Sequence, residues 1–193
     1  LAPLLEFGLK SVIVTTAQAV SGAGYPGVAS LDIIGNIIPE VPGEEHKMET
    51  ETQKIFGQLR NGKIEPHDMA LSAATTRVPV INGHTEMVSV EFTTCPAEAD
   101  VRAAFDKFCG RPQYGRLPSA PARPVVYLED ALRPQPRLDA DRDGGMAVSV
   151  GRLRPCSVLD YKFVVLGHNT IRGAAGAAIL NAEMMHTDGL LGD

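Results

Sequence analysis

The sequence predicts an α+β domain built on one mixed, largely antiparallel sheet with flanking helices. Runs rich in β-branched residues recur along the chain, and the helical segments between them do not alternate strictly with strands as a parallel βαβ fold requires. The chain has 193 residues, of which 44% are hydrophobic, and is therefore long enough to bury a core of its own.

The first part of the chain predicts a buried strand, a glycine-rich turn and two helices. Segment 11–16 is rich in β-branched residues and leads to the polar Gln18, and the glycine turn spans 21–27. Segment 31–34 is compatible with a short helix. Segment 43–58 predicts a longer one, because acidic residues occupy its first turn and a lysine comes near its end, as the helix dipole favours.

The middle of the chain predicts two strands and a surface helix. The strands, 71–80 and 85–93, flank Asn82-Gly83, which is a strong signal for a hairpin turn. Segment 96–108 has apolar residues at helical spacing on one face, which is typical of an amphipathic helix.

The last third begins with a proline-rich connection, 111–145, around one short strand near Val125. Two more strands are expected at 147–152 and 158–166. Asn169-Thr170 then predicts the N-cap of a final helix, 171–185. The glycines and alanines at the start of this helix allow a neighbouring surface or ligand to approach its backbone closely.

Composition excludes several classes of function. A formal net charge of -5 with scattered basic residues argues against a nucleic-acid partner. The longest apolar runs are far too short to cross a bilayer. The three cysteines, Cys95, Cys109 and Cys156, have neither disulfide-framework nor metal-ligand spacing, and the histidines form no ligand pair, so we expect no metal and a cytoplasmic location.

The chain opens on Leu1-Ala2-Pro3-Leu4-Leu5, an apolar stretch without an initiator methionine. Such a start looks like a chain cut within a structure. We therefore expect a fragment of a longer protein.

The segment from Gly22 to Gly27 has the Gly-x-Gly-x-x-Gly spacing of dinucleotide-binding loops. That loop must open a helix whose N-terminus holds the pyrophosphate, and Pro26-Gly27 stands where the helix should already be running. A glycine-rich turn is the better interpretation.

Arg77 and His84 stand on either side of the predicted turn, which can bring a guanidinium and an imidazole to the same edge of a sheet. Arginine there could bind a carboxylate through two hydrogen bonds, and histidine could transfer protons near neutral pH. From the spacing alone, a surface arginine and a turn histidine with no joint role are the commoner outcome.

Two weaker patterns accompany this pair. Glu51 and Lys54 lie at i and i+3 of the predicted helix and share a face, which suits a zwitterionic ligand but is more often a solvated ion pair. Gln18 follows an apolar strand, where sites in open sheets often lie, although a strand-end amide bonded to backbone is the commoner case.

Taken in order, four segments resemble the aspartate-semialdehyde dehydrogenase family, most closely its fungal and archaeal branch. The segments are 15–27, 49–55, 77–86 and 168–176. The resemblance covers essentially the whole chain. It implies the substrate-binding and dimerisation domain of a two-domain NADP enzyme whose N-terminal nucleotide-binding domain is missing here.

The family converts aspartate 4-semialdehyde, phosphate and NADP into 4-aspartyl phosphate and NADPH, in the biosynthesis of threonine, methionine and lysine. The family's nucleophilic cysteine would lie shortly before Leu1. The resemblance implies that His84 is the general acid/base, that Arg77 binds the substrate carboxylate and that Gln18 orients the substrate. Glu51 would bind the substrate amine, and Lys54 would bind phosphate.

The resemblance also assigns the cofactor side. Ser21, Gly22, Ala23 and Gly24 would lie against the nicotinamide end of NADP, and Asn169 matches a position that contacts the cofactor. Residues 1–166 would form the substrate-binding and dimerisation domain, and 167–193 would pack on the absent nucleotide domain. The isolated chain should then form a homodimer or homotetramer, bind NADP weakly or not at all, and be inactive.

Two alternatives stay open at this point. A related acyl-phosphate reductase, such as N-acetylglutamyl-phosphate reductase, would share the two-domain plan, but a free substrate amine calls for a carboxylate such as Glu51. The other alternative is a stand-alone dimerisation or scaffold domain without catalysis.

Overall fold

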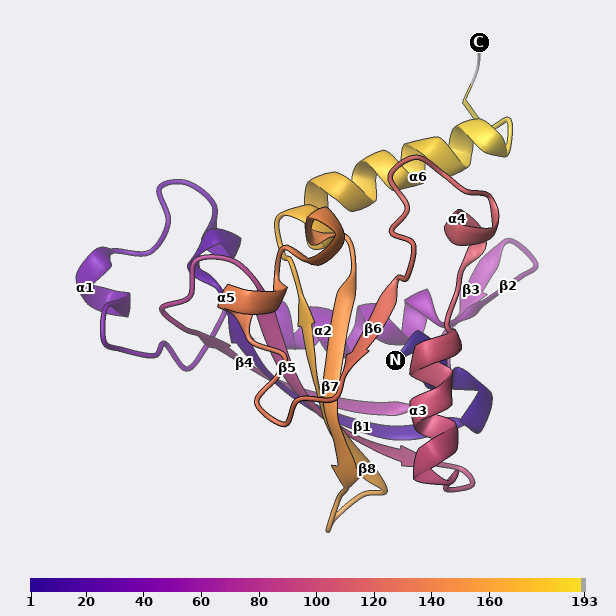
Figure 1. Cartoon of the computed structure of the whole chain (residues 1–193), viewed down its shortest axis with the longest axis horizontal. Helices are drawn as coiled ribbons and strands as arrows, with labels where there is room; N and C mark the ends of the chain where they lie inside the picture. Colours follow the sequence, from indigo (N-terminus) through magenta and orange to yellow (C-terminus); the bar gives the residue numbers. More distant parts are fainter. Residues whose placement is uncertain (192–193) are drawn as a thin grey trace.

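The computed structural model describes residues 1–191 and has a six-stranded sheet at its centre (Figure 1). The strands are β1 (Leu9–Gln18), β4 (Ala70–Arg77), β5 (His84–Phe92), β6 (Val125–Leu128), β7 (Val148–Pro155) and β8 (Tyr161–Gly167). They lie in the order β4-β1-β5-β8-β7-β6. β1 is parallel to β4 and β6 is parallel to β7, while the other neighbouring pairs are antiparallel. The predicted α+β class with a mixed, largely antiparallel sheet is confirmed.

One face of the sheet carries the main hydrophobic core. Val12 and Val14 of β1 are buried while Ile13 between them is 46% exposed, because successive side chains of a strand point to opposite faces. Leu4 and Phe105 are fully buried against the same face. The elements that cover it are η1 (Ala2–Phe7), α2 (Glu44–Ile55) and α3 (Glu98–Lys107).

The predicted hairpin between segments 71–80 and 85–93 is wrong, although both strands form. β1 lies between β4 and β5 and pairs with each of them. Gly83 does adopt a positive φ of 96°, the conformation that an Asn-Gly signal favours. A turn signal fixes the local backbone but does not choose the neighbouring strand, and segment 78–83 is long enough to cross the end of β1.

A hairpin that was not predicted follows α2. Its strands are β2 (Gln58–Arg60) and β3 (Lys63–Glu65), and the turn between them is Asn61-Gly62, with φ values of 51° and 74°. Two positive φ values are what a type I′ hairpin turn requires. The signal was present in the sequence, and α2 ends at Ile55 rather than at Gln58.

Helix α2 covers the edge strand β4 and runs antiparallel to it. Glu45 near the start of the helix accepts a hydrogen bond from the backbone N–H of Thr75 (2.8 Å), and Glu49 accepts one from Ala73 (3.1 Å). Further along, the Gln53 amide donates to the carbonyl of Met69 (2.8 Å). Two acidic side chains thus pair with N–H groups that an edge strand would otherwise leave exposed.

The elements within the proline-rich connection 111–145 are short, as expected. The strand predicted near Val125 is confirmed as β6. The other short elements are η2 (Val20–Ala23), α1 (Ser30–Ile33), α4 (Arg111–Tyr114), α5 (Pro136–Asp139) and η3 (Arg142–Gly145).

The final helix is confirmed, and Thr170 of the predicted Asn169-Thr170 pair is its N-cap residue, although the Thr170 side chain makes no capping hydrogen bond. The helix starts as a π-helical turn, η4 (Ile171–Ala175), and continues as α6 (Gly176–Thr187). The imidazole Nδ1 of His168 accepts a hydrogen bond from the Ile171 N–H (3.2 Å), whereas the Asn169 side chain bonds elsewhere. Leu180 anchors α6 on Leu117 and Met146.

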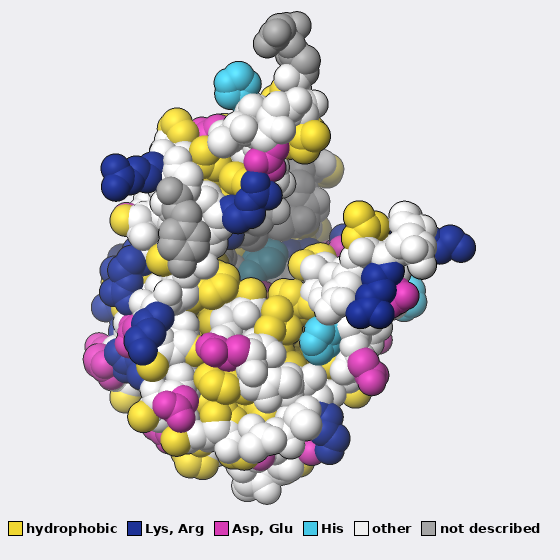
Figure 2. Space-filling view, turned by 90° about the vertical axis from the view of Figure 1, so that its right-hand side faces the viewer, with side chains coloured by type: hydrophobic (Ala, Val, Ile, Leu, Met, Phe, Trp, Pro, Cys, Tyr) yellow, Lys and Arg dark blue, Asp and Glu magenta, His cyan; other side chains and the backbone are white. Residues whose placement is uncertain are grey.

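Figure 2 shows the surface hollowed between the β2–β3 hairpin and the part of the molecule that carries α6, with hydrophobic side chains gathered in the hollow. None of the helices within residues 1–191 is long and apolar enough to span a membrane.

Candidate functional site

Four neighbouring strands bring their polar ends to one edge of the sheet. β1, β4 and β8 end there and β5 begins there. Three loops follow from this arrangement: 19–24 after β1, 78–83 before β5, and 168–170 after β8. The first two are joined by hydrogen bonds from the N–H groups of Val20 and Ser21 to the carbonyls of Val80 (2.8 Å) and Ile81 (3.2 Å). This edge is called the site edge below.

Arg77, the last residue of β4, is almost fully buried at the site edge, with 7% of its surface exposed. Its Nη1 donates to the carbonyl of Ala19 (2.9 Å) and makes a long contact of 3.5 Å with Oε1 of Gln18, the last residue of β1. Burial lowers the pKa of Arg77, and the nearby Glu44 carboxylate opposes this shift. A guanidinium remains charged even so, and the site edge therefore holds a fixed positive charge.

His84, the first residue of β5, lies beside Arg77. Its Nδ1 accepts a hydrogen bond from the Ala19 N–H (3.0 Å), so in the neutral imidazole the proton is on Nε2. Burial, and then the positive charge of Arg77, lower the pKa of His84 to about 4, while Glu44 acts in the opposite direction. The imidazole is therefore neutral at physiological pH.

Gly22 lies directly against this pair. A Cβ atom added to Gly22 would stand 2.8 Å from Nη1 of Arg77 and 3.0 Å from Cε1 of His84. Such distances are shorter than van der Waals contact, so this position has no room for a side chain. The neighbouring Gly24 has open space around it, and Ala23 and Gly24 are exposed.

Asn169 joins all three loops. Its Oδ1 accepts a hydrogen bond from the Gly83 N–H (2.9 Å), and its Nδ2 donates to the hydroxyl of Ser21 (2.9 Å). Asn169 thus comes to the same place as Ser21 and Gly22, from the far end of the sequence.

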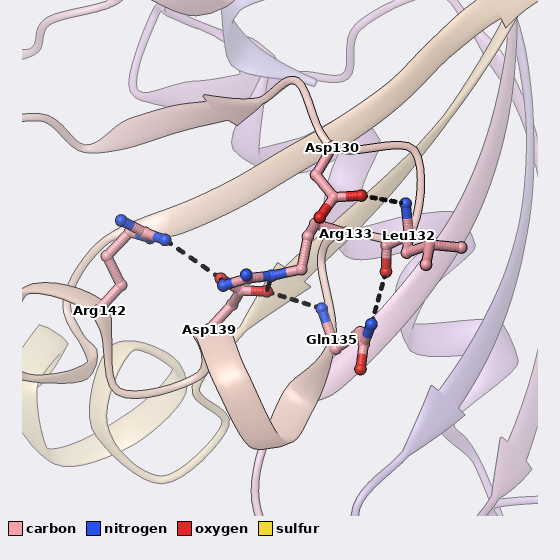
Figure 3. Close-up of polar contacts among 6 residues, drawn as sticks. All are labelled: Asp130, Leu132, Arg133, Gln135, Asp139 and Arg142. Atoms are coloured by element: carbon pink, nitrogen blue, oxygen red, sulfur yellow. Dashed lines mark hydrogen bonds and ion pairs between the residues drawn. The ribbon is translucent and has the colours of Figure 1, made fainter.

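A single buried carboxylate, bound by two arginines, supports the loop that precedes His84. Asp139 at the end of α5 is 1% exposed and binds both Arg133 and Arg142 (Figure 3). It also accepts a hydrogen bond from the Gln135 N–H (2.8 Å). α5 packs against Gly83, where an added Cβ would lie 3.1 Å from Cβ of Ala140.

The structure does not bring Glu51 and Lys54 to the site edge. Because α2 runs antiparallel to β4, its first turn is the part nearest Arg77, and Lys54 lies about 15 Å further along the helix axis than Glu44. Both side chains are exposed. Glu44 acts electrostatically on Arg77 and His84, and it forms an ion pair with Lys47 (3.1 Å).

Glu44 and Lys47 were missed by the sequence analysis although they have the same i, i+3 spacing as Glu51 and Lys54. The sequence offers both pairs on one helix. Only the direction of that helix relative to the sheet distinguishes them.

None of the three cysteines reaches the site edge. Cys95 follows the opposite end of β5, Cys156 follows the opposite end of β7, and Cys109 follows α3. Within residues 1–191 there is also no group of three or more histidine, cysteine or acidic side chains placed to hold a metal ion.

Comparison with known proteins agrees with the resemblance in the sequence. A family model described as the semialdehyde dehydrogenase dimerisation domain matches residues 1–172. The aspartate-semialdehyde dehydrogenase of Methanothermobacter thermautotrophicus is 50% identical over 189 residues, which cover 96% of this chain and 54% of that protein. The enzyme of Candida albicans is 46% identical over 202 residues, covering 99% of this chain and 55% of that protein. The chain thus spans about half the length of the curated relatives it matches.

Solved structures give the same result. A crystal structure of the Candida albicans enzyme with NADP superimposes with a TM-score of 0.89 at 43% identity, over 98% of this chain and 54% of that one. An aspartate-semialdehyde dehydrogenase II complex from Vibrio cholerae gives a TM-score of 0.76 at 26% identity, over 96% of this chain and 57% of that one.

Proposed function

Because the chain belongs to the family of semialdehyde dehydrogenase dimerisation domains, we propose that it is the substrate-binding part of an NADP-dependent aspartate-semialdehyde dehydrogenase. The observation that supports this most directly is that buried Arg77 and neutral His84 both bond to Ala19 and both lie against Gly22 at one edge of the sheet. A fixed cation next to a neutral imidazole suits a substrate that has both a carboxylate and a reacting carbonyl.

Arg77 binds the α-carboxylate of the substrate in this proposal. Its Nη1 is used for the Ala19 carbonyl, which holds the guanidinium in place, while its other N–H groups can face the ligand. Gln18 borders the same space and orients the substrate.

His84 acts on the oxygen of the reacting carbon. The Ala19 N–H selects the tautomer with the proton on Nε2, so this nitrogen can donate a hydrogen bond to the developing alkoxide and exchange a proton with it. Near neutral pH the imidazole is uncharged, in accordance with its lowered pKa.

Glu44 and Lys47 are better placed than Glu51 and Lys54 to bind the substrate amine and the phosphate. Glu44 is close enough to Arg77 and His84 to oppose the lowering of both pKa values, and Lys47 forms an ion pair with it. We assign the substrate amine to Glu44 and the phosphate to Lys47. Each of Glu51 and Lys54 lies about two helical turns further from the site edge than its counterpart.

The residues at the site edge fit the nicotinamide end of NADP. Ser21, Gly22, Ala23 and Gly24 form a surface with almost no side-chain bulk beside His84. When bound there, NADP would accept hydride from the substrate carbon. This chain would contribute a flat contact surface and its neighbour Asn169, while the remaining cofactor contacts belong to the nucleotide-binding part of the enzyme.

The reaction also needs a nucleophilic thiol, and Cys95, Cys109 and Cys156 lie away from the site edge. We therefore propose that the nucleophilic thiol belongs to a part of the enzyme outside this chain. It follows that the isolated chain should fold but show no dehydrogenase activity, and should bind NADP only weakly.

The open face of the sheet is the surface proposed for dimerisation. Opposite the core, β1 and β5 present Ile13, 46% exposed, and Met87, 42% exposed, among small and polar side chains. A homodimer, alone or within a homotetramer, would bury these two apolar side chains.

The test uses the full-length protein that contains this chain, assayed with semialdehyde, phosphate and NADP. Arg77→Lys should lower kcat/KM by about 30- to 1000-fold, because lysine cannot meet both carboxylate oxygens at once. His84→Asn should lower kcat with little change in KM, because the carboxylate site is intact.

Arg137 is exposed, and Arg137→Lys serves as the matched control, which should leave kcat and KM unchanged. Near-normal efficiency of Arg77→Lys, or an effect of both substitutions on KM alone, would contradict the roles assigned to Arg77 and His84.

A further inference from the structure

We propose that Asn169 is a positioning residue, whose side-chain amide couples the 19–24 loop to the 78–83 loop, which leads into His84. This inference rests on the proposed function for its catalytic consequence, but its structural basis is independent of that function. The sequence resemblance assigns Asn169 only to the cofactor.

The hydrogen bonds around Asn169 close a ring. Ser21 N–H donates to the Ile81 carbonyl, Gly83 N–H donates to Asn169 Oδ1, and Asn169 Nδ2 donates to the Ser21 hydroxyl. Each of the three loops is therefore bonded to the other two. His84 follows Gly83 directly, and its Nδ1 is bonded to Ala19, two residues before Ser21.

The orientation of the Asn169 amide is determined by its partners. A backbone N–H can only donate, so the atom facing Gly83 must be Oδ1 and the atom facing Ser21 must be Nδ2. The Ser21 oxygen then accepts a bond from Asn169, and its own proton is left to point toward a ligand. Asn169 thereby makes Ser21 a hydrogen-bond donor on the surface proposed for the nicotinamide.

The hydrogen bonds of Asn169 affect catalysis through the distance between the proposed nicotinamide surface and the His84 imidazole, and not through charge. Hydride transfer requires the nicotinamide surface and the imidazole to keep a fixed separation, since small displacements of reacting groups cost rate. Without Asn169, the backbone bonds of Val20 and Ser21 and the bond from Ala19 to His84 remain, but the Gly83 N–H loses its acceptor and Ser21 loses its side-chain link to the third loop.

The first measurement is amide hydrogen exchange by NMR on the chain itself. Asn169→Ala should raise the exchange rate of the Gly83 amide by about 10-fold or more, because its acceptor is gone. Asn169→Asp keeps an acceptor and should preserve protection. The Ala73 amide in the edge strand β4, bonded to Glu49 of α2, reports whether the fold is intact and should be unchanged.

The second measurement is steady-state kinetics of the full-length protein. Asn169→Ala should lower kcat by about 10- to 100-fold. Ser21→Ala should lower kcat by a smaller factor. In the Asn169→Ala background it should lower kcat little further, because both substitutions remove the same hydrogen bond between Ser21 and Asn169. The exposed Asn181 on α6 provides the matched control, and Asn181→Ala should change neither exchange nor kcat.

Three outcomes would overturn the proposal: unchanged Gly83 exchange in Asn169→Ala, additive effects of the Ser21 and Asn169 substitutions, or a rise in the KM for NADP with kcat unchanged. The last result would make Asn169 a simple cofactor contact. If the wild-type full-length protein had no activity on the semialdehyde, the proposed function would fail, and the Gly83 exchange rate would still decide whether Asn169 couples the loops.

Discussion

The two nitrogens of the His84 imidazole have different surroundings, and this difference determines what the side chain can do. Nδ1 is bonded to a backbone N–H, which cannot accept a proton, so a second proton on Nδ1 would break that bond. Burial and the adjacent Arg77 act in the same direction and lower the pKa to about 4. The site edge thus favours a neutral histidine that donates from Nε2.

We expect His84 to stay uncharged down to about pH 5, well below the ordinary histidine pKa of about 6.5. Because folding lowers this pKa, the unfolded chain binds more protons between about pH 4 and 6.5. His84 therefore leaves the free energy of unfolding unchanged above about pH 6.5. As the pH falls toward 4, the free energy of unfolding decreases by an amount on the order of 1 to 3 kcal/mol.

Urea unfolding of the chain at pH 7.5 and 5.0, with His84→Asn as the reference, measures this contribution. An NMR titration of the imidazole gives the pKa directly. A midpoint near 6.5, or equal pH dependence of the two proteins, would show that the imidazole is not desolvated as described.

Gly22 is the second residue whose identity the packing determines. In Gly22→Ala the new methyl group would collide with Arg77 and His84, and neither can retreat easily because both are bonded to Ala19. We expect the full-length enzyme to lose about 10- to 100-fold in kcat/KM. Gly167→Ala, whose Cβ would enter open space, should retain activity. Equal activity of Gly22→Ala and wild type would place the substrate elsewhere.

At the scale of elements, α2 and α5 connect the sheet to the site edge. α2 pairs its acidic side chains with the edge strand and thereby brings its first turn, rather than its last, toward Arg77. α5 is held by the buried carboxylate of Asp139 and packs on Gly83. Both elements act on the site through the position of a neighbouring loop or strand.

Asp139→Asn should destabilise the chain by about 2 to 4 kcal/mol, because an amide cannot balance two guanidinium groups in a buried position. Desolvation alone would raise the pKa of Asp139, but the hydrogen bonds from Arg133, Gln135 and Arg142 outweigh it, and the pKa is lowered. The stabilisation is therefore present above about pH 4 and is lost as the pH falls below that value.

Chemical denaturation of wild type and Asp139→Asn at pH 7 measures the effect. Asp130→Asn, at an exposed position in the same segment, is the control and should cost far less, since Asp130 accepts only the Leu132 N–H. A similar decrease in the free energy of unfolding of the two variants would show that the buried carboxylate of Asp139 does not stabilise the chain more than an exposed one.

At the scale of the whole molecule, the sheet is covered unevenly. Its core face is packed by η1, α2 and α3, and on the other face Pro134 of the 130–142 segment packs against Gly151 of β7. The strands β1 and β5 keep Ile13 and Met87 exposed there. Exposed apolar side chains on a sheet face are typical of a surface that pairs with another copy.

We expect the wild-type chain to be at least dimeric at tens of micromolar and Met87→Lys to shift it toward monomer, because a buried, unpaired ammonium opposes association. Light scattering after size-exclusion chromatography gives the mass. Ile64→Lys replaces a side chain of matched exposure (44%) on the β2–β3 hairpin and should not change the mass. A monomeric wild type, or equal effects of both substitutions, would exclude this face as the interface.

The sequence by itself determined most of the local structure and the order of the site residues. Its periodicities located the strands of the sheet and the helices α2, α3 and α6, because burial of alternate or every third to fourth residue leaves a local pattern. The resemblance of four segments to a known family, rather than the spacing of Arg77 and His84, predicted that these two residues belong to one site. The structure brings these two together with Gln18 and Gly22, while their roles in substrate binding stay predictions.

Only the tertiary structure decided which segments are neighbours. It placed β1 between two strands that the Asn82-Gly83 turn had predicted to pair, and it used Asn61-Gly62 for a hairpin instead. It turned α2 so that Glu44, not Glu51, lies nearest the site edge, and it joined Asn169 to Gly83. Strand pairing and helix direction depend on contacts between residues far apart in the chain, and a local pattern carries no information about them.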